Sequence, residues 1–208
     1  TVDAIKQKLH PVDKQRKSEV LIHLIKKNSW GQVLVFCRTK RGADILVSQL
    51  ENAGITADSI HANRTQRART LALDGFKNGN IAILVATDIA SRGIDIEQLP
   101  CVVNYDLPYV PEDYVHRIGR TGRAGTSGLA ISLFSEDESK QLQSIERVIG
   151  RKFERLTLPG FTVTKKRPAE LLNDNDNGDG DDDDEYGNFE ADPKPQHRGQ
   201  SQGRKNRK

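Results

Sequence analysis

Apolar residues recur along the first three quarters of the chain with two different spacings. Between residues 14 and 28 they stand three or four positions apart, as on one face of a helix, whereas Val33 to Cys37 is apolar without a break. The alternation continues, and it predicts helices over residues 14–28, 40–52, 65–79 and 136–149 and strands over residues 33–37, 56–60, 81–86, 101–105 and 129–134. Strands that are apolar throughout are buried on both faces, and strands that alternate with helices form parallel sheets. The pattern therefore predicts an α/β fold, with a parallel sheet that has helices on both faces.

The composition changes near residue 162. Residues 174–185 are Asp, Asn and Gly with one Glu, and the last dozen residues are rich in Gln, Gly, Arg and Lys. Neither segment can bury enough apolar surface to offset the entropy lost on ordering. Residues 1–163 hold 23 Lys and Arg against 18 Asp and Glu, while residues 164–208 hold 9 against 11. We predict a mildly basic domain over residues 1–162 and a disordered tail, acidic and then basic, over residues 163–208.

Several classes of protein are disfavoured. The longest apolar stretch, Ile81–Ala86, is far shorter than the roughly 20 residues that a membrane-spanning helix needs. Cys37 and Cys101 lie far apart in apolar runs and lack the spacing of metal ligands, so we expect buried, reduced thiols in a cytoplasmic protein and no metal site. The chain starts at Thr1 and contains no methionine, which suggests a fragment of a longer protein.

The segment from Tyr114 to Gly125 concentrates the candidate chemistry. It places Arg117, Arg120 and Arg123 three residues apart, with glycines between and after them. Guanidinium groups bind phosphate oxygens through paired hydrogen bonds, and glycines let the backbone approach a ligand closely. The pattern is typical of a polyphosphate site, but a solvated basic loop fits the spacing as well.

Residues 116–123, His-Arg-Ile-Gly-Arg-Thr-Gly-Arg, resemble motif VI of the DEAD-box ATP-dependent RNA helicases. In that family the motif lies on the C-terminal RecA-like domain and faces ATP that the N-terminal domain holds. The resemblance implies that Arg120 and Arg123 are arginine fingers, which stabilise charge on the transferred phosphoryl group. By the same resemblance, His116 helps to link the nucleotide to the other domain, and Arg117 mainly supports the loop.

Residues 85–96, at the end of the most apolar strand, resemble motif V of the same family. A polar loop at the carboxyl end of a parallel strand is where ligands of open α/β sheets bind. The resemblance implies that Thr87 and Asp88 contact RNA and neighbouring motifs, and that Gly93 and Asp95 lie near the nucleotide ribose. For Asp88, a cap on the following turn is the structural alternative.

Two shorter segments agree with this family. Residues 33–41 resemble motif IV, which would place Arg41 at a helix start suited to an RNA phosphate, and Gln66 and Arg69 resemble an accessory motif on the RNA side. One position departs, because the family's usual His-Gly is His61-Ala62 here, and this puts both residues in doubt as RNA contacts. The resemblance covers residues 1–162 and is strongest to the bacterial RhlE group.

The chain contains neither a G-x-x-x-x-G-K-[ST] loop nor the sequence Asp-Glu-Ala-Asp. The resemblance thus implies half of an enzyme, with ATP and Mg²⁺ held mainly by the missing N-terminal domain and with no activity from this chain alone. The complete protein would be a monomer that hydrolyses ATP and unwinds RNA, gripping its backbone without reading sequence, and it would have no membrane partner. Two alternatives stay open: part of a DNA helicase of the same superfamily, or a non-catalytic module that binds nucleic acid or another protein.

Overall fold

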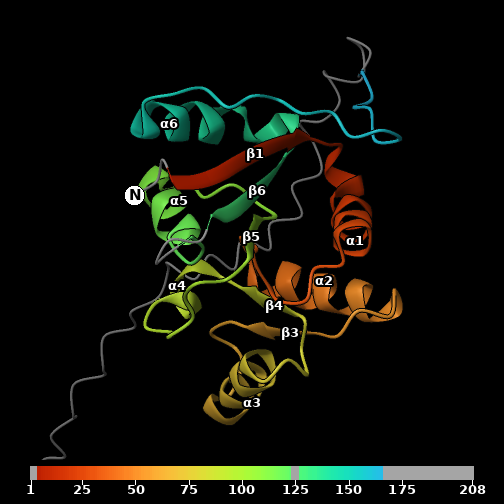
Figure 1. Ribbon diagram of the computed structural model, residues 1–208, viewed down its shortest axis with the longest axis vertical. Coiled ribbons are helices and arrows are strands. Elements are labelled where there is room, and N and C mark those ends of the chain that lie inside the picture. The colour runs from red at the N-terminus through yellow and green to blue at the C-terminus, as the bar shows by residue number, and fades with distance from the viewer. Residues whose placement is uncertain (1–3, 123–126, 166–208) are drawn as a thin grey trace, which may run out of the picture.

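Six parallel strands form the centre of the molecule, in the order β1-β6-β5-β2-β4-β3 (Figure 1). The computed structural model describes residues 4–122 and 127–165. The strands are β1 (Ile5–Pro11), β2 (Val33–Phe36), β3 (Ala57–Ile60), β4 (Ile83–Ala86), β5 (Cys101–Asn104) and β6 (Gly128–Phe134). The helices are α1 (Lys17–Asn28), α2 (Lys40–Asn52), α3 (Gln66–Lys77), α4 (Asp88–Ser91), α5 (Pro111–Ile118) and α6 (Ser139–Ile149), with single 3₁₀ turns η2 (Lys14–Arg16) and η3 (Glu136–Glu138).

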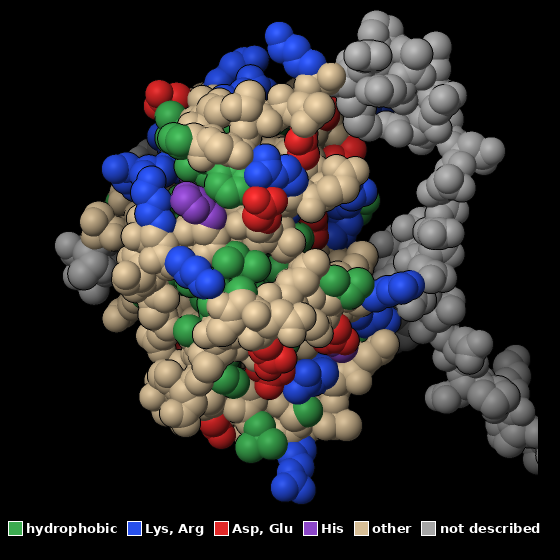
Figure 2. Space-filling view, turned by 90° about the vertical axis from the view of Figure 1, so that its right-hand side faces the viewer, with side chains coloured by type: hydrophobic (Ala, Val, Ile, Leu, Met, Phe, Trp, Pro, Cys, Tyr) green, Lys and Arg blue, Asp and Glu red, His purple; other side chains and the backbone are tan. Residues whose placement is uncertain are grey.

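The sheet is buried on both faces, as the unbroken apolar runs predict. In β2, Val33 and Val35 pack toward α1 and α2, whereas Leu34 and Phe36 pack toward α3 and α4. Helices α5 and α6 cover the same face as α3, over β1 and β6. Figure 2 views the molecule from the side that carries α1 and α2, where Lys and Arg are interspersed with Asp and Glu. The predicted α/β fold is therefore confirmed.

Several predicted boundaries match the structure closely, because local signals set them. Helix α2 begins after Thr39, whose side chain accepts a hydrogen bond from the backbone N–H of Gly42 at 3.0 Å. Helix α3 begins after Thr65, which caps Ala68 in the same way at 3.1 Å. The expected strands are all present, although most are one or two residues shorter than predicted.

The sequence patterns missed strand β1 and helices α4 and α5. In β1, Ile5 and Leu9 face the core while charged Lys6 and Lys8 lie between them, so the strand lacks the unbroken apolar run of its neighbours. The apolar pattern assigned no helix to the arginine-rich segment. Its first half is instead the end of α5, which begins with Pro111 and carries acidic residues in its first turn, both common signals of a helix start.

Residues 151–165 return along the free side of β1. The backbone N–H of Leu156 donates to the carbonyl of Leu9 at 2.9 Å, and His10 Nδ1 lies 2.7 Å from the Leu156 carbonyl. Further on, the ring of Phe161 packs against Arg16 and His23. We call residues 151–165 the C-terminal strap. Residues 166–208, which make up nearly all of the predicted tail, lie outside the described residues.

Both cysteines are buried and unpaired, as predicted. Burial raises the pKa of the Cys101 thiol to about 12, and it also raises that of Cys37. Neither thiol is therefore a reactive nucleophile at neutral pH. None of the helices in the described residues combines the length and the apolar composition that crossing a bilayer requires.

Candidate functional site

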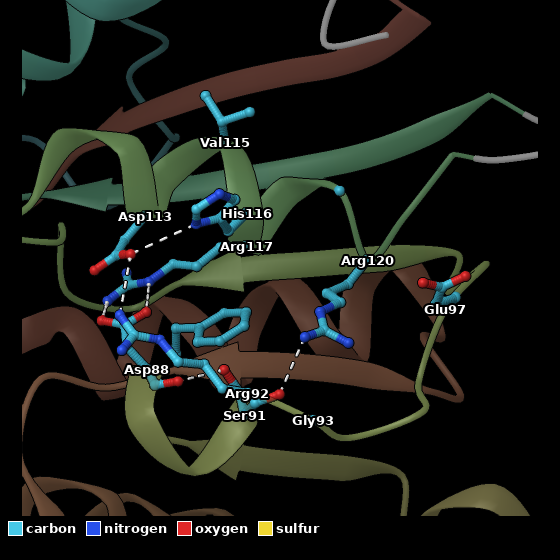
Figure 3. Close-up of a pocket in the computed structure, with 12 residues that line it drawn as sticks. Asp88, Ser91, Arg92, Gly93, Glu97, Asp113, Val115, His116, Arg117 and Arg120 are labelled. Atoms are coloured by element: carbon cyan, nitrogen blue, oxygen red, sulfur yellow. Dashed lines mark hydrogen bonds and ion pairs between the residues drawn. The ribbon is translucent and has the colours of Figure 1, made fainter.

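An open pocket of about 410 Å³ lies where strands β2 and β4 end, between the loop after β4 and helix α5 (Figure 3). Parallel strands all end at this edge, so the loops that follow them converge here. The pocket is lined by Phe36, Asp88, Ser91, Arg92, Gly93, Glu97, Asp113, Val115, His116, Arg117, Gly119 and Arg120. The two segments that resemble motifs V and VI therefore face each other across one cavity.

Arg117 joins the two sides of this pocket. Its Nε and Nη2 donate to the two carboxylate oxygens of Asp88, each at 2.6 Å, and its Nη1 donates to the Asp106 carbonyl at 2.6 Å. Its guanidinium also lies 5.0 Å from the centre of the Phe36 ring. The side chain is buried, and its donors are engaged by the protein. Arg117 therefore supports the loop, in agreement with the role that the resemblance gave it.

Arg120 also binds the loop after β4, but through backbone carbonyls. Its Nη1 donates to Ile94 at 2.7 Å, and its Nη2 donates to Ser91 at 3.0 Å. These contacts hold the guanidinium against the pocket wall, where a bound phosphate would compete with the carbonyls for it. Its predicted companion Arg123 lies outside the described residues.

The two predicted ribose contacts lie on the same loop. Gly93 lines the pocket with φ +76°, a backbone conformation that other residues rarely adopt. Asp95 lies two residues further along and is exposed. The loop thus presents the Gly93 backbone to the pocket and the Asp95 carboxylate to solvent.

Asp113 was not singled out from the sequence, although it connects two exposed basic side chains at the rim. Its Oδ1 lies 3.5 Å from Arg92 Nη2 and 3.6 Å from His116 Nδ1. The side chain of His116 is 78% exposed, so it is open to a ligand or a partner domain. The available signal was the i, i+3 spacing of Asp113 and His116 on one helix face.

The predicted RNA contacts after β4 are less accessible. Thr87 is buried, and its hydroxyl has no hydrogen-bond partner among the described residues. Asp88 is committed to Arg117 rather than to capping a helix, since the residue before α4 is Thr87 and no side-chain cap forms there. RNA contact by either residue would therefore require this region to rearrange.

A second hollow, of about 320 Å³, contains Arg41 and the His61 region. Arg41 is exposed at the start of α2. His61 is buried: its Nε2 lies 2.8 Å from Asp44 Oδ1, while its Nδ1 accepts the backbone N–H of Asn63 at 3.2 Å. The imidazole thus holds the loop after β3, and Ala62 beside it is exposed.

The other two predicted RNA contacts lie on the first turn of α3. Gln66 is exposed and Arg69 is partly exposed. The structure thus places Arg41, Gln66 and Arg69 at the starts of helices that follow β2 and β3, the two strands that flank β4. A chain of phosphates could run across these helix starts, whose N-terminal ends favour anions.

A buried ionic cluster beside the pocket was missed from the sequence. Lys17 and Glu138, 2% and 1% exposed, pair at 2.5 Å, and Lys17 also lies 3.5 Å from Asp106. Glu138 further accepts from Arg38 Nη2 at 3.3 Å and from the backbone N–H of Leu107 at 2.7 Å. The signal was a lysine on the apolar stripe of the first predicted helix, three residues before Val20. The cluster fixes the loop between β5 and α5. Because α5 carries Arg117, this loop also helps to set the position of the Arg117 side chain.

Residues 16–125 match the family model of the helicase conserved C-terminal domain. This chain belongs to that family. The matched range contains all the segments that line the pocket. Among known relatives, the ATP-dependent RNA helicase RhlB of Pseudomonas syringae pv. tomato is 42% identical over 157 residues, which are 76% of this chain and 40% of the relative.

Solved structures give the same result for this helicase C-terminal domain. The C-terminal domain of the DEAD-box protein Dbp5 superposes with a TM-score of 0.69 at 34% identity, covering 76% of this chain and 92% of that one. The E. coli DEAD-box protein SrmB, bound to regulator of ribonuclease activity A, gives a TM-score of 0.71 at 32% identity, with coverages of 78% and 98%. The fold is therefore the RecA-like C-terminal domain of the DEAD-box RNA helicases. The chain spans between 30% and 40% of the length of the curated relatives that it matches.

Proposed function

We propose that this chain is the half of an ATP-dependent RNA helicase that completes the ATP site and carries part of the RNA-binding surface. The observation that supports this best is the pocket between residues 88–97 and α5, which brings cationic groups of both segments to one open cavity. Within the described residues, no cluster of His, Cys, Asp or Glu could hold a metal ion. Mg²⁺ and most of the contacts to ATP would therefore come from the N-terminal domain of the complete protein.

In this proposal the ATP phosphates approach the pocket from the partner domain. Arg120 and Arg123 would stabilise the charge that develops on the transferred phosphoryl group, after Arg120 exchanges its carbonyl partners for phosphate oxygens. His116, at the exposed rim, would contact the partner domain near the nucleotide. Gly93 and Asp95 would lie against the ribose. Arg117 would not bind ATP, because its guanidinium already donates to Asp88 and to the Asp106 carbonyl.

RNA would lie across the helix starts at the same edge of the sheet. Arg41, Gln66 and Arg69 offer donors to the sugar-phosphate backbone, with Thr87 and Asp88 contributing after a rearrangement of the loop. Such contacts carry affinity without sequence information. We propose that the complete protein acts as a cytoplasmic monomer, and that this chain alone hydrolyses no ATP because it lacks a phosphate-binding loop.

The test compares the complete protein with this chain. RNA-stimulated ATP hydrolysis is expected only from the complete protein, and Arg120→Ala should lower its turnover by roughly a factor of 10³. Arg147→Ala, an exposed arginine on α6, is the matched control and should leave turnover unchanged. A loss of less than about tenfold for Arg120→Ala would make that residue a scaffold. Equal stimulation and unwinding with DNA would favour the DNA helicase alternative.

A further inference from the structure

The loop between β5 and α5 exposes an aromatic ring that the proposed ATP site does not use. Tyr109 is 60% exposed and Val110 beside it is 45% exposed. The guanidinium of Arg38, two residues after β2, lies 4.5 Å from the centre of the Tyr109 ring. One face of the ring is therefore covered by a cation, while much of the ring stays open to solvent.

The stack of Tyr109 on Arg38 is anchored from below. Glu138, which is buried, accepts from Arg38 Nη2 at 3.3 Å and from the backbone N–H of Leu107 at 2.7 Å. The backbone N–H of Arg38 donates to Asp106 at 2.9 Å. Two carboxylates, buried Glu138 and partly exposed Asp106, thus join Arg38 to the loop that carries Tyr109. Because Arg38 and this loop are already fixed, the Tyr109 ring loses less freedom when a planar ligand covers it.

Basic residues lead away from this ring toward the helix starts. The chain continues from Arg38 through Lys40 to Arg41, and Lys40 Nζ lies 3.5 Å from the side-chain oxygen of Asn63 in the loop after β3. An aromatic ring followed by a track of cations is the arrangement that binds single-stranded nucleic acid. The bases stack on the ring, and the cations follow the backbone.

We propose that the exposed face of Tyr109 is a stacking platform for an unpaired base of the bound RNA. This inference rests on the proposed RNA-binding function. It adds a base contact to a surface that would otherwise contact only the sugar-phosphate backbone of the RNA. Arg38 would support the ring from beneath and add positive charge below the stack. Because every base has a flat face, the platform would favour unpaired strands over duplex without reading sequence.

The experiment measures binding of a labelled single-stranded RNA to the 208-residue chain at several salt concentrations. Tyr109→Ala should weaken binding by about fivefold or more, Tyr109→Phe should keep wild-type affinity, and Tyr109→Leu should behave like alanine. The salt dependence should not change, because no phosphate contact is lost. Arg41→Ala should instead reduce the slope of log affinity against log salt concentration by up to roughly 0.7. Val148→Ala, also exposed but on α6, is the control.

A second RNA with abasic positions shows whether the base is the ligand. This RNA should bind wild type and Tyr109→Ala equally. The proposal of a stacking platform is wrong if Tyr109→Leu keeps wild-type affinity, or if every variant binds the intact RNA equally well. The exposed residues then serve a protein partner instead. If the wild-type chain binds no RNA at all, the platform fails as well. The proposed function then fails separately only if RNA does not stimulate ATP hydrolysis by the complete protein.

Discussion

The basic side chains near the C-terminal edge of the sheet form two groups that differ in burial. Arg117 and Lys17 are buried, and each donates to a carboxylate and to a backbone carbonyl. Arg92 and His116 lie at the pocket rim, exposed and more than 3.4 Å from their shared partner Asp113. The buried group shapes the site, whereas the exposed group is available to ligands. Charge alone therefore does not identify a binding residue at this edge.

The sharpest test of this comparison removes one buried cation. Lys17→Ala should lower the free energy of unfolding by about 3–5 kcal/mol, because it leaves Glu138 and Asp106 short of their buried partner. Lys14→Ala is the matched control, since Lys14 is 69% exposed and pairs with Asp137 at 3.6 Å. It should cost less than about 1 kcal/mol. Urea denaturation measures both, and equal losses would contradict the distinction.

A smaller effect is expected when the charge is kept and only the geometry changes. Arg117→Lys preserves the positive charge beside Asp88 but cannot form two parallel hydrogen bonds and reach the Asp106 carbonyl as well. We expect a loss of about 2 kcal/mol in the free energy of unfolding. Arg92→Lys, at the exposed rim, should change it by less than about 0.5 kcal/mol. If Arg117→Lys kept the wild-type free energy of unfolding, charge would matter more than the paired hydrogen bonds of the guanidinium.

The smallest effect concerns pH and a buried histidine far from the pocket. Burial lowers the pKa of His10 below its ordinary value of 6.5; the Leu156 carbonyl opposes this shift, and the charge of Lys8 adds to it. The unfolded chain therefore takes up this proton at a higher pH than the folded one. This contribution to stability is complete above pH 6.5 and is lost as the pH falls toward the lowered value. Thermal unfolding between pH 7 and 5 should show the loss, and His10→Gln should remove that part of the dependence, with His116→Gln as the control.

The fold was largely predictable because its signals are local. Unbroken apolar runs such as Val33 to Phe36 mark strands that are buried on both faces, and Thr39 and Thr65 cap the helices that they precede. Strand β1 escaped because Lys6 and Lys8 interrupt its apolar residues, and it is held by pairing with β6, more than a hundred residues away.

The sequence predicted where the site lies, but it did not predict the role of each residue. Arg117 and Arg120 are three positions apart in one motif, yet α5 ends between them, so Arg117 points into the sheet edge and Arg120 toward the loop after β4. Nothing in the spacing separates these roles. Likewise, the burial of Lys17 depends on Glu138, 121 residues further along the chain. Partners at such separations follow from the tertiary fold and not from any local pattern.

The C-terminal strap has a consequence for self-association. Strand β1 is the last in its sheet, and a terminal strand offers a row of unpaired N–H and C=O groups to which another chain can add. The Leu156 N–H occupies the Leu9 carbonyl, and Arg155 lies beside Leu9 in a parallel bridge, so the strap partly fills this row with the domain's own backbone. The strap therefore shields part of the β1 edge from intermolecular strand addition. A chain that ended at Gly150 would keep the pocket and the helices around it, but it would present an uncovered strand to its neighbours.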